Sequence, residues 1–226
     1  MAFISDVHSN LEALEAVLGQ LGKEELFCLG DIVGYGSNPN EVIQLLKDRR
    51  AVAVRGNHDE AVLTGDTSWF NARAAMAAKW TTGQLSEESR AYLRGLPLQI
   101  RTAVEEVQTY LTHGSPDDNL HEYVDPATHS ELLGHYLARL DVRLLGLGHT
   151  HLPYVWKEDS GTVFNPGSVG QPRDNDWRAS FAYVTFAEGK AEVQLLRTEY
   201  DCRKAAGKML KAGLPESLAM RLLPRT

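Results

Sequence analysis

The sequence predicts an α/β fold in which two stacked β-sheets are flanked by helices on their outer faces. Three observations support this prediction. Strands and helices alternate up to residue 55, which is typical of a parallel sheet covered by helices. From residue 98 onward, short apolar runs separated by turn residues dominate. The chain is 43% hydrophobic and 23% charged, a composition that is ordinary for a globular protein with a sizeable core.

The first part of the chain reads as strand, helix, strand, helix, strand. Ser9 and Asn10 are suitable N-cap residues for a helix with an apolar stripe of leucine and valine. Asn38 followed by Pro39 is typical of the start of a second helix. The predicted strands cover residues 2–5, 26–29 and 51–55, and the helices between them cover residues 11–21 and 39–50.

The pattern changes after His58. An Ala-rich stretch and a second stretch capped by Ser86 predict two helices, and Pro97 ends them. A polar loop over 115–125 precedes one further helix. The predicted helices are 69–84, 86–95 and 128–140, and the predicted strands are 98–103, 107–111 and 142–147.

The last part of the chain is rich in strands and closes with two short helices. Its predicted strands are 153–157, 162–164, 180–186 and 190–197, and its helices lie near 200–212 and 215–222. This order predicts that the second sheet is mainly antiparallel. No repeat and no linker divides the chain, so we expect a single domain over residues 1–226.

Composition limits the function. The formal net charge of -7 gives no basic surface for nucleic acid, so an anionic substrate needs a local positive charge. The only two cysteines, Cys28 and Cys202, suggest a reducing compartment. The first strand begins almost at Met1, and no apolar run is long enough for a membrane span. We expect a cytoplasmic protein that acts on a small molecule; the sequence does not indicate its oligomeric state.

Five predicted strands end in polar residues that can bind metals. These residues are Asp6 and His8; Asp31; Asn57, His58 and Asp59; His113; and His149 and His151. Loops at the carboxyl ends of strands are where open α/β sheets bind ligands. Each motif alone is ordinary, because a single histidine after a strand is more often structural than a ligand. Their recurrence at five strand ends predicts one shared site.

The residue types indicate what this site binds. Two carboxylates, one carboxamide and four imidazoles, with His58 as a fifth, form a mixed oxygen and nitrogen set suited to manganese, iron, zinc or nickel. One catalytic metal uses three or four protein ligands, which is fewer than this set offers. Two divalent ions that share a bridging carboxylate better explain why the set contains seven candidate ligands.

These motifs resemble those of the calcineurin-like metallophosphoesterases. The resemblance rests on the order and spacing of Asp6-x-His8, Gly30-Asp31, Gly56-Asn57-His58-Asp59, His113 and Gly148-His149-x-His151. Gly30-Asp-Ile-Val-Gly-Tyr-Gly36 and Asn165-Pro-Gly-Ser-Val-Gly170 further resemble the small bacterial and archaeal phosphodiesterase branch. The resemblance implies a four-layer α/β/β/α sandwich of two mixed sheets.

The resemblance also implies a role for each residue. It assigns seven ligands, which are Asp6, His8 and His151 for one ion, Asn57, His113 and His149 for the other, and Asp31 as the bridge. It places His58 over the leaving group as the general acid. The implied cofactors are two divalent ions, with manganese expected first and iron, zinc or nickel as alternatives. Such a pair, about 3.5–4 Å apart, clamps phosphoryl oxygens and supplies a bridging hydroxide that attacks a small phosphodiester.

One departure from the family narrows the expected substrate. Its protein serine/threonine phosphatases carry Gly-Asp-x-x-Asp-Arg-Gly, whereas Gly34 and Tyr35 stand here in place of that second Asp and the Arg. We therefore expect phosphoproteins to be poor substrates. Asp59 is a candidate stabiliser of a protonated His58, and Arg173 is a candidate substitute for the missing anion contact, although a solvated surface arginine is the more ordinary interpretation.

A scaffold function is the alternative to catalysis. A retromer subunit that resembles this family keeps the fold without the reaction, but it lacks a histidine at the position of His58, which favours an enzyme here. We expect no metal at His121, His129 or His135 and no chemistry in the segment after Tyr200.

Overall fold

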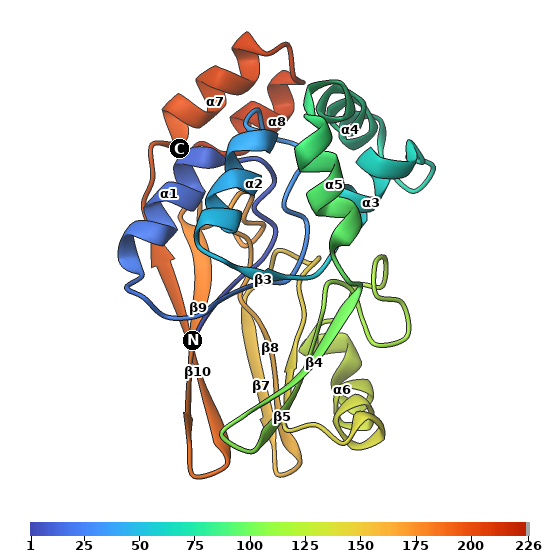
Figure 1. The fold of residues 1–226 in the computed structure, drawn as a ribbon, viewed down its shortest axis with the longest axis vertical. Coiled ribbons are helices and arrows are strands. Elements are labelled where there is room, and N and C mark those ends of the chain that lie inside the picture. The colour runs from blue at the N-terminus through green and yellow to red at the C-terminus, as the bar shows by residue number, and fades with distance from the viewer. Residues whose placement is uncertain (225–226) are drawn as a thin grey trace.

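The computed structural model describes residues 1–224, which form two five-stranded sheets packed between two layers of helices (Figure 1). This arrangement confirms the predicted α/β/β/α sandwich. The polar residues that follow the strands meet where the ends of the two sheets come together.

The first sheet has the order β10-β9-β1-β2-β3. Its strands are β1 (Ala2–Ile4), β2 (Leu26–Cys28), β3 (Val52–Ala53), β9 (Ala179–Ala187) and β10 (Lys190–Thr198). The strands β1, β2 and β3 run parallel, while β9 pairs antiparallel with both β1 and β10. The carboxyl ends of the three parallel strands therefore lie at one edge of this sheet.

The second sheet has the order β4-β5-β6-β8-β7. Its strands are β4 (Gln99–Val104), β5 (Val107–Thr112), β6 (Leu144–Gly146), β7 (Tyr154–Glu158) and β8 (Gly161–Asn165). Our prediction of a mainly antiparallel sheet was wrong, because β6 runs parallel to both of its neighbours and only the two outer pairs are antiparallel. The C-terminal hairpin β9-β10 joins the first sheet instead. The alternation of side chains along a strand indicates which residues share a face of the sheet, but it does not indicate the neighbouring strand.

Helices cover the outer face of each sheet. Those on the side of the first sheet are α1 (Leu11–Gln20), α2 (Pro39–Asp48), α3 (Asn57–Thr64), α4 (Ala72–Gln84), α5 (Glu87–Gly95), α7 (Cys202–Lys211) and α8 (Glu216–Met220). The outer face of the second sheet is covered by α6 (Pro126–Leu140). Two predicted caps are confirmed, since the side chain of Asn10 accepts from the backbone of Ala13 and that of Ser86 accepts from Ser89. Asn38 is the N-cap residue of α2, with Pro39 next to it as predicted, but its side chain makes no capping hydrogen bond.

Aromatic side chains fill the space between the two sheets. The ring of Phe3 stacks on Phe27 with centroids 5.0 Å apart and meets Phe164 of the other sheet edge-on at 5.1 Å. All three side chains are buried. Because such a core is closely packed, the strand ends of the two sheets are held at a fixed separation.

The short helix α3 was not predicted. We expected Asn57, His58 and Asp59 to lie in a loop, but they form its first turn. Gly56 is extended at the N-cap, and the Asp59 carboxylate accepts from its backbone N–H at 3.0 Å, which is half of a capping box. Gly65 ends the helix with φ of 79°. Gly56 and Asp59 are three residues apart, which is the spacing of the N-cap and N3 positions of a helix, so the sequence already contained a signal for the start of α3.

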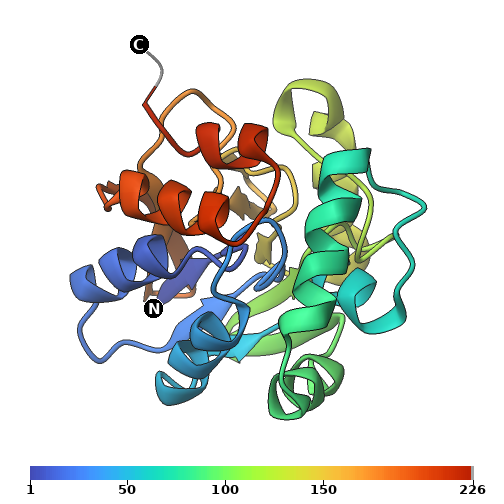
Figure 2. The same cartoon turned by 90° about the horizontal axis from the view of Figure 1, so that it is seen from above.

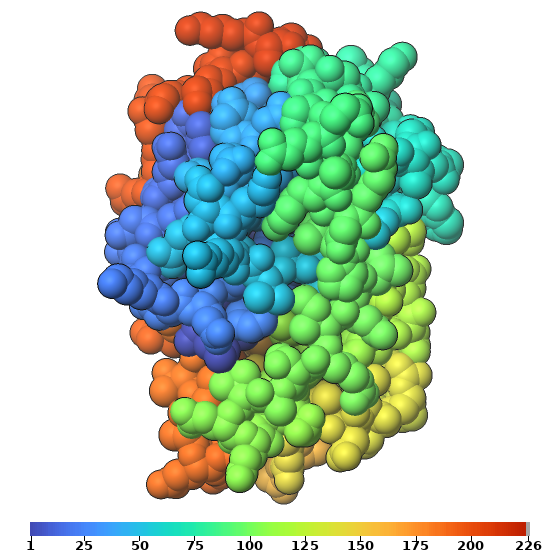
Figure 3. All heavy atoms as spheres, in the orientation of Figure 1, coloured from blue at the N-terminus to red at the C-terminus, as the bar shows by residue number. Residues whose placement is uncertain are grey.

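The C-terminal helices complete the layer over the first sheet. In the space-filling view they lie above the N-terminal segment (Figure 3), and Lys208 of α7 pairs with the buried Glu12 of α1 at 2.6 Å. Seen from above, α8 and α4 flank the central loops (Figure 2). Within residues 1–224, no helix has the length and apolar character needed to cross a membrane.

Candidate metal centre

The seven predicted ligands come together in the interior, between the ends of the two sheets. Each side chain follows its strand as expected and is almost inaccessible to solvent. Within the described part of the chain, three clusters have the mutual distances of metal-binding groups: Asp6, His8 and His151; His8, Asp31 and His58; and Asp31, His113 and His149. Asn57 joins the third cluster through its Oδ1 atom, which lies 3.1 Å from His113 Nε2.

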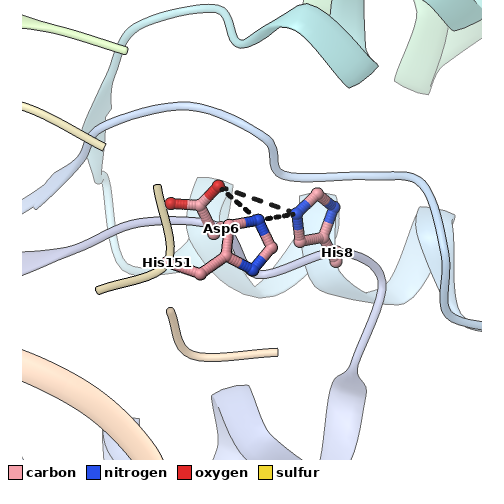
Figure 4. A group of neighbouring side chains, drawn as sticks. All are labelled: Asp6, His8 and His151. Atoms are coloured by element: carbon pink, nitrogen blue, oxygen red, sulfur yellow. Dashed lines mark hydrogen bonds and ion pairs between the residues drawn. The ribbon is translucent and has the colours of Figure 1, made fainter. Parts of the chain in front are cut away.

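The first cluster joins the end of β1 to the segment after β6 (Figure 4). His8 Nε2 lies 3.1 Å from His151 Nε2. Asp6 Oδ1 lies 3.6 Å from the first of these nitrogens and 3.2 Å from the second. This oxygen is buried and accepts no hydrogen bond from residues 1–224. Three atoms with lone pairs therefore converge on one point without satisfying one another, as expected of ligands for a shared cation.

Backbone carbonyls orient three of the imidazoles. In each case Nδ1 donates to a main-chain oxygen: His8 to Val33 at 3.2 Å, His113 to Leu29 at 2.7 Å and His151 to Gln171 at 2.6 Å. A carbonyl oxygen can only accept, so these contacts place the proton on Nδ1 and leave Nε2 directed into the site. Such contacts behind histidine ligands orient the ring and fix its tautomer.

Asp31 lies between the first and third clusters. Its Oδ2 atom is 3.6 Å from His8 Nε2 and 3.4 Å from His113 Nε2. In the third cluster, His149 has the opposite tautomer, because its Nε2 donates to the carbonyl of His121 at 3.1 Å and leaves Nδ1 free to bind a metal. A single carboxylate oxygen thus faces both sets of ligands, which is the position of a bridging ligand.

Charge within the cluster suits divalent cations. Burial opposes ionisation of Asp6 and Asp31, but the neighbouring histidines outweigh it and hold the pKa of both carboxyls well below the usual value. Burial lowers the pKa of His149 to about 3 and that of His151 to about 4, so both imidazoles are neutral. Burial also disfavours a charged His113, yet Asp31 overrides it and raises the pKa to about 9. A cation bound there would displace this proton.

The backbone of the site is strained. Five of the seven predicted ligands have positive φ: Asp6 (53°), His8 (48°), Asp31 (51°), His149 (65°) and His151 (61°). Such conformations cost non-glycine residues on the order of 1–3 kcal/mol each and concentrate at functional sites. No pattern in the sequence indicated this strain, and the contacts around the site must hold these conformations in place.

The loop over 165–170 supplies several of these contacts. Asn165 donates from Nδ2 to the carbonyl of Gly148 at 2.6 Å, and Gly170 donates its N–H to the carbonyl of Asp6 at 2.9 Å. A Cβ atom at Gly170 would lie 1.9 Å from the carbonyl oxygen of Val7, so only glycine fits. This loop therefore ties the end of β1 to the His149–His151 segment and brings the ligands of the two sheets together.

His58 is held by aromatic rings instead of a carboxylate. Its ring lies 4.3 Å from Phe70 in a stacked arrangement and 4.4 Å from Tyr35, measured between centroids. Its Nδ1 atom has no hydrogen-bond partner within residues 1–224 and lies against Gly34, where a Cβ atom would approach to 2.5 Å. Burial lowers the pKa of His58 well below its usual value, and the charge of Asp31 only partly opposes this.

Within residues 1–224, the Asp59 side chain makes no hydrogen bond with His58, so its stabilising effect on a protonated His58 stays a prediction. Its buried carboxylate accepts from the backbone N–H groups of Ile32 at 3.3 Å, Val33 at 3.0 Å and Gly56 at 3.0 Å. Burial and the nearby charge of Asp31 raise its pKa to about 6 against these hydrogen bonds. Asp59 holds the backbone that follows Asp31 in place.

A cavity of about 340 Å³ opens beside the candidate ligands. Its wall contains several side chains to which we assigned no function, among them Trp69, Phe70, His121, Tyr123 and Arg221. Arg173 also lines it and is half-buried, so it is not a solvated surface arginine. These residues belong to segments without metal-binding motifs, and no pattern in the sequence indicated that the fold collects them here.

Gly34→Ala should displace the ring of His58, because the added methyl group meets Nδ1 and the backbone at Gly34 has φ of 94°. We expect lower turnover with little change in bound metal. Gly65→Ala is a matched control, since that residue also has positive φ (79°) but faces open space. Equal turnover in the two variants, normalised to metal content, would show that the packing of Gly34 against His58 does not matter.

The fold and the site together define a metal-binding α/β protein whose ligands follow the strands of two facing sheets. Comparisons with known proteins identify the family. The model of the calcineurin-like phosphoesterase superfamily domain matches residues 1–189. The chain therefore belongs to the calcineurin-like phosphoesterase superfamily, as the sequence motifs predicted.

Three relatives illustrate the range of similarity. An uncharacterized protein of Methanocaldococcus jannaschii is 38% identical, and the match covers 98% of this chain and 96% of the relative. The crystal structure of a metallophosphoesterase from Sphaerobacter thermophilus is 36% identical with a TM-score of 0.84, and 98% of each chain is covered. Phosphodiesterase YfcE of Escherichia coli is 29% identical over 76% of this chain and 80% of its own length.

Proposed function

We propose that this protein is a dinuclear metal-dependent phosphodiesterase that hydrolyses small phosphodiesters. The observation that carries the proposal is the position of Asp31, whose Oδ2 atom faces ligand sets on both sides at 3.6 Å and 3.4 Å. The similarity to a phosphodiesterase of Escherichia coli supports the reaction class. The presence of His58 in the cavity wall favours an enzyme over a scaffold.

The ligand assignment is the one that the family resemblance implies, and the clusters support it. Asp6, His8 and His151 would hold one ion, and Asn57, His113 and His149 the other. When bound, the two ions would supply Lewis acidity for the phosphoryl oxygens and an activated water. We propose manganese for both positions, because imidazole and carboxylate ligands together suit it, with iron, zinc or nickel as alternatives.

The protein contributes the proton that the leaving group needs. With Nδ1 of His58 packed against Gly34, Nε2 is the nitrogen available to a substrate. The imidazole is neutral in the free protein, since burial lowers its pKa. A phosphate in the cavity would favour the protonated form through its negative charge. His58 Nε2 would then donate to the oxygen that departs from phosphorus.

The shape of the site favours small substrates over phosphoproteins. Gly34 leaves no space for a carboxylate behind His58, and Tyr35 places an aromatic ring beside it. Aromatic residues such as Trp69 and Tyr123 line the cavity and can stack on a planar group of the substrate.

Substrate preference tests the proposed function. The protein loaded with manganese should hydrolyse bis(4-nitrophenyl) phosphate faster than 4-nitrophenyl phosphate, and it should hydrolyse a phosphoserine peptide poorly. Metal analysis should find two ions per chain, and removing them with a chelator should abolish activity and lower the melting temperature. A phosphopeptide as the best substrate would refute the substrate class. Two bound ions without hydrolysis of any ester would favour the scaffold.

A further inference from the structure

Two arginines from distant segments face the cavity of the metal centre. Arg173 follows the loop over 165–170, and Arg221 caps the C-terminal end of α8. Both residues also line a second cavity of about 270 Å³, whose wall includes Asp176, Trp177 and Leu223 but none of the candidate metal ligands. Arg173 and Arg221 are therefore shared by the walls of both cavities.

These arginines have no acidic partner. Within residues 1–224, no carboxylate lies within ion-pair distance of either guanidinium group, whereas the nearby Arg178 pairs with Asp176 at 2.7 Å. Arg221 is exposed, and its Nη1 atom donates a hydrogen bond to the side-chain oxygen of Gln171 at 3.4 Å. Arg173 has a buried Nε atom without a hydrogen-bond partner. Leaving a buried donor of a charged group unpaired is costly, which points to an anion that completes the site.

The location separates this anion from the phosphate at the metal centre. A group held by both arginines can extend into the second cavity, away from Asp31 and the histidines. The forked guanidinium group matches the oxygens of a phosphate. The chain carries a net charge of -7, which does not attract an anionic substrate. Two arginines without acidic partners at one place provide a local positive charge that does attract it.

We propose that Arg173 and Arg221 form a subsite for a second phosphate of the substrate, next to the phosphodiester at the metal centre. This inference rests on the proposed function and makes the preferred substrate a diester with a further phosphate, as in a phosphorylated nucleotide. The portion beyond that phosphate packs against Trp177 in the second cavity. Arg221 lies outside residues 1–189, so the subsite depends on a segment beyond the family domain.

Two esters with the same leaving group test the subsite. They are the 4-nitrophenyl ester of thymidine 5′-phosphate and the same compound with an added 3′-phosphate. The wild-type protein should prefer the second by about tenfold or more in kcat/KM, since charge-assisted hydrogen bonds to phosphate are of that strength. Arg173→Gln and Arg221→Gln should each reduce this ratio, and the double variant should bring it close to one. Arg203→Gln, an exposed arginine on α7, should keep the wild-type ratio.

Direct binding provides a readout that is independent of turnover. Calorimetry with the manganese-loaded protein should show tighter binding of thymidine 3′,5′-bisphosphate and thymidine 5′-diphosphate than of thymidine 5′-phosphate. The difference should shrink in the double variant and be partly kept in Arg173→Lys and Arg221→Lys, which retain charge without the fork. Thermal unfolding verifies that each variant is folded.

The outcomes separate the two proposals. Hydrolysis of both esters at equal kcat/KM, with equal binding of the three nucleotides, overturns the subsite and leaves the phosphodiesterase intact. An unchanged preference in the folded double variant also overturns it. Failure to hydrolyse either ester overturns the proposed function, and the binding comparison then decides the subsite alone.

Discussion

Replacing Asp31 with asparagine is expected to abolish phosphodiester hydrolysis and to lower the metal content. One oxygen of this carboxylate faces His8 Nε2 at 3.6 Å and His113 Nε2 at 3.4 Å, while the other accepts the backbone N–H of His58 at 2.8 Å. An amide keeps the size of the side chain but is neutral. If the amide oxygen faces the cations, the NH₂ group lies against the backbone N–H of His58, and two donors then face each other. In the reverse orientation the NH₂ group faces the cations and cannot bridge them.

The measurement combines turnover with metal analysis. Asp31→Asn should bind fewer than two ions per chain, and manganese should raise its melting temperature less than that of the wild type. Asp141→Asn is the matched control, because Asp141 also has positive φ (52°) but is exposed at the end of α6. Two retained ions with near-normal turnover in Asp31→Asn would refute the two-metal assignment.

The α/β fold class and the position of the polar residues at strand ends follow from strong local signals, whereas the four-layer architecture and the role of each ligand were implied by the resemblance to the family. Apolar runs that end in polar residues mark the carboxyl ends of β1, β2 and β3, and parallel pairing brings those ends to one edge. His113 and the His149–His151 segment follow strands of the second sheet. When the two sheets stack, these histidines therefore come close to the polar residues that follow β1, β2 and β3. These features could be predicted because each depends on the period of a short segment.

Other features depend on contacts between distant segments. The β9-β10 hairpin belongs to the first sheet because β9 pairs with β1. The alternation of apolar and polar residues within the hairpin does not indicate which strand it will pair with. The carbonyls that fix the histidine tautomers come from loops far along the chain, such as that of Gln171 for His151. Arg221 reaches the cavity only because α7 and α8 return over α1. Strain at positive φ has the same origin, since it exists only where tertiary contacts enforce it.

The effect of replacing His58 depends on the leaving group. As the bond to phosphorus breaks, negative charge develops on the departing oxygen, and a proton from His58 Nε2 neutralises it. General acid catalysis of this kind is worth roughly 10²–10⁴-fold. We expect His58→Ala to reduce kcat much more than it raises KM. The loss should be smallest for nitrophenolate, a stable anion, and should grow with the pKa of the leaving group.

Metal analysis separates this function from a ligand role. His58 lies within metal-binding distance of His8 and Asp31, so its geometry alone permits either. His58→Ala should retain both ions and the fold, because the proposed ligand sets are complete without it. Phe70→Leu is an informative companion, since it removes the ring stacked on His58 at 4.3 Å and should lower kcat in the same direction by a smaller factor.

The decisive measurement is kcat for a series of diesters whose leaving groups span a range of pKa. A steeper dependence on leaving-group pKa in His58→Ala than in the wild type, at equal metal content, is the expected result. Equal losses across the series would remove His58 from the role of general acid, because only proton donation to the leaving oxygen makes the loss depend on that oxygen. Loss of an ion would instead make His58 a ligand, in keeping with its place beside Asp31.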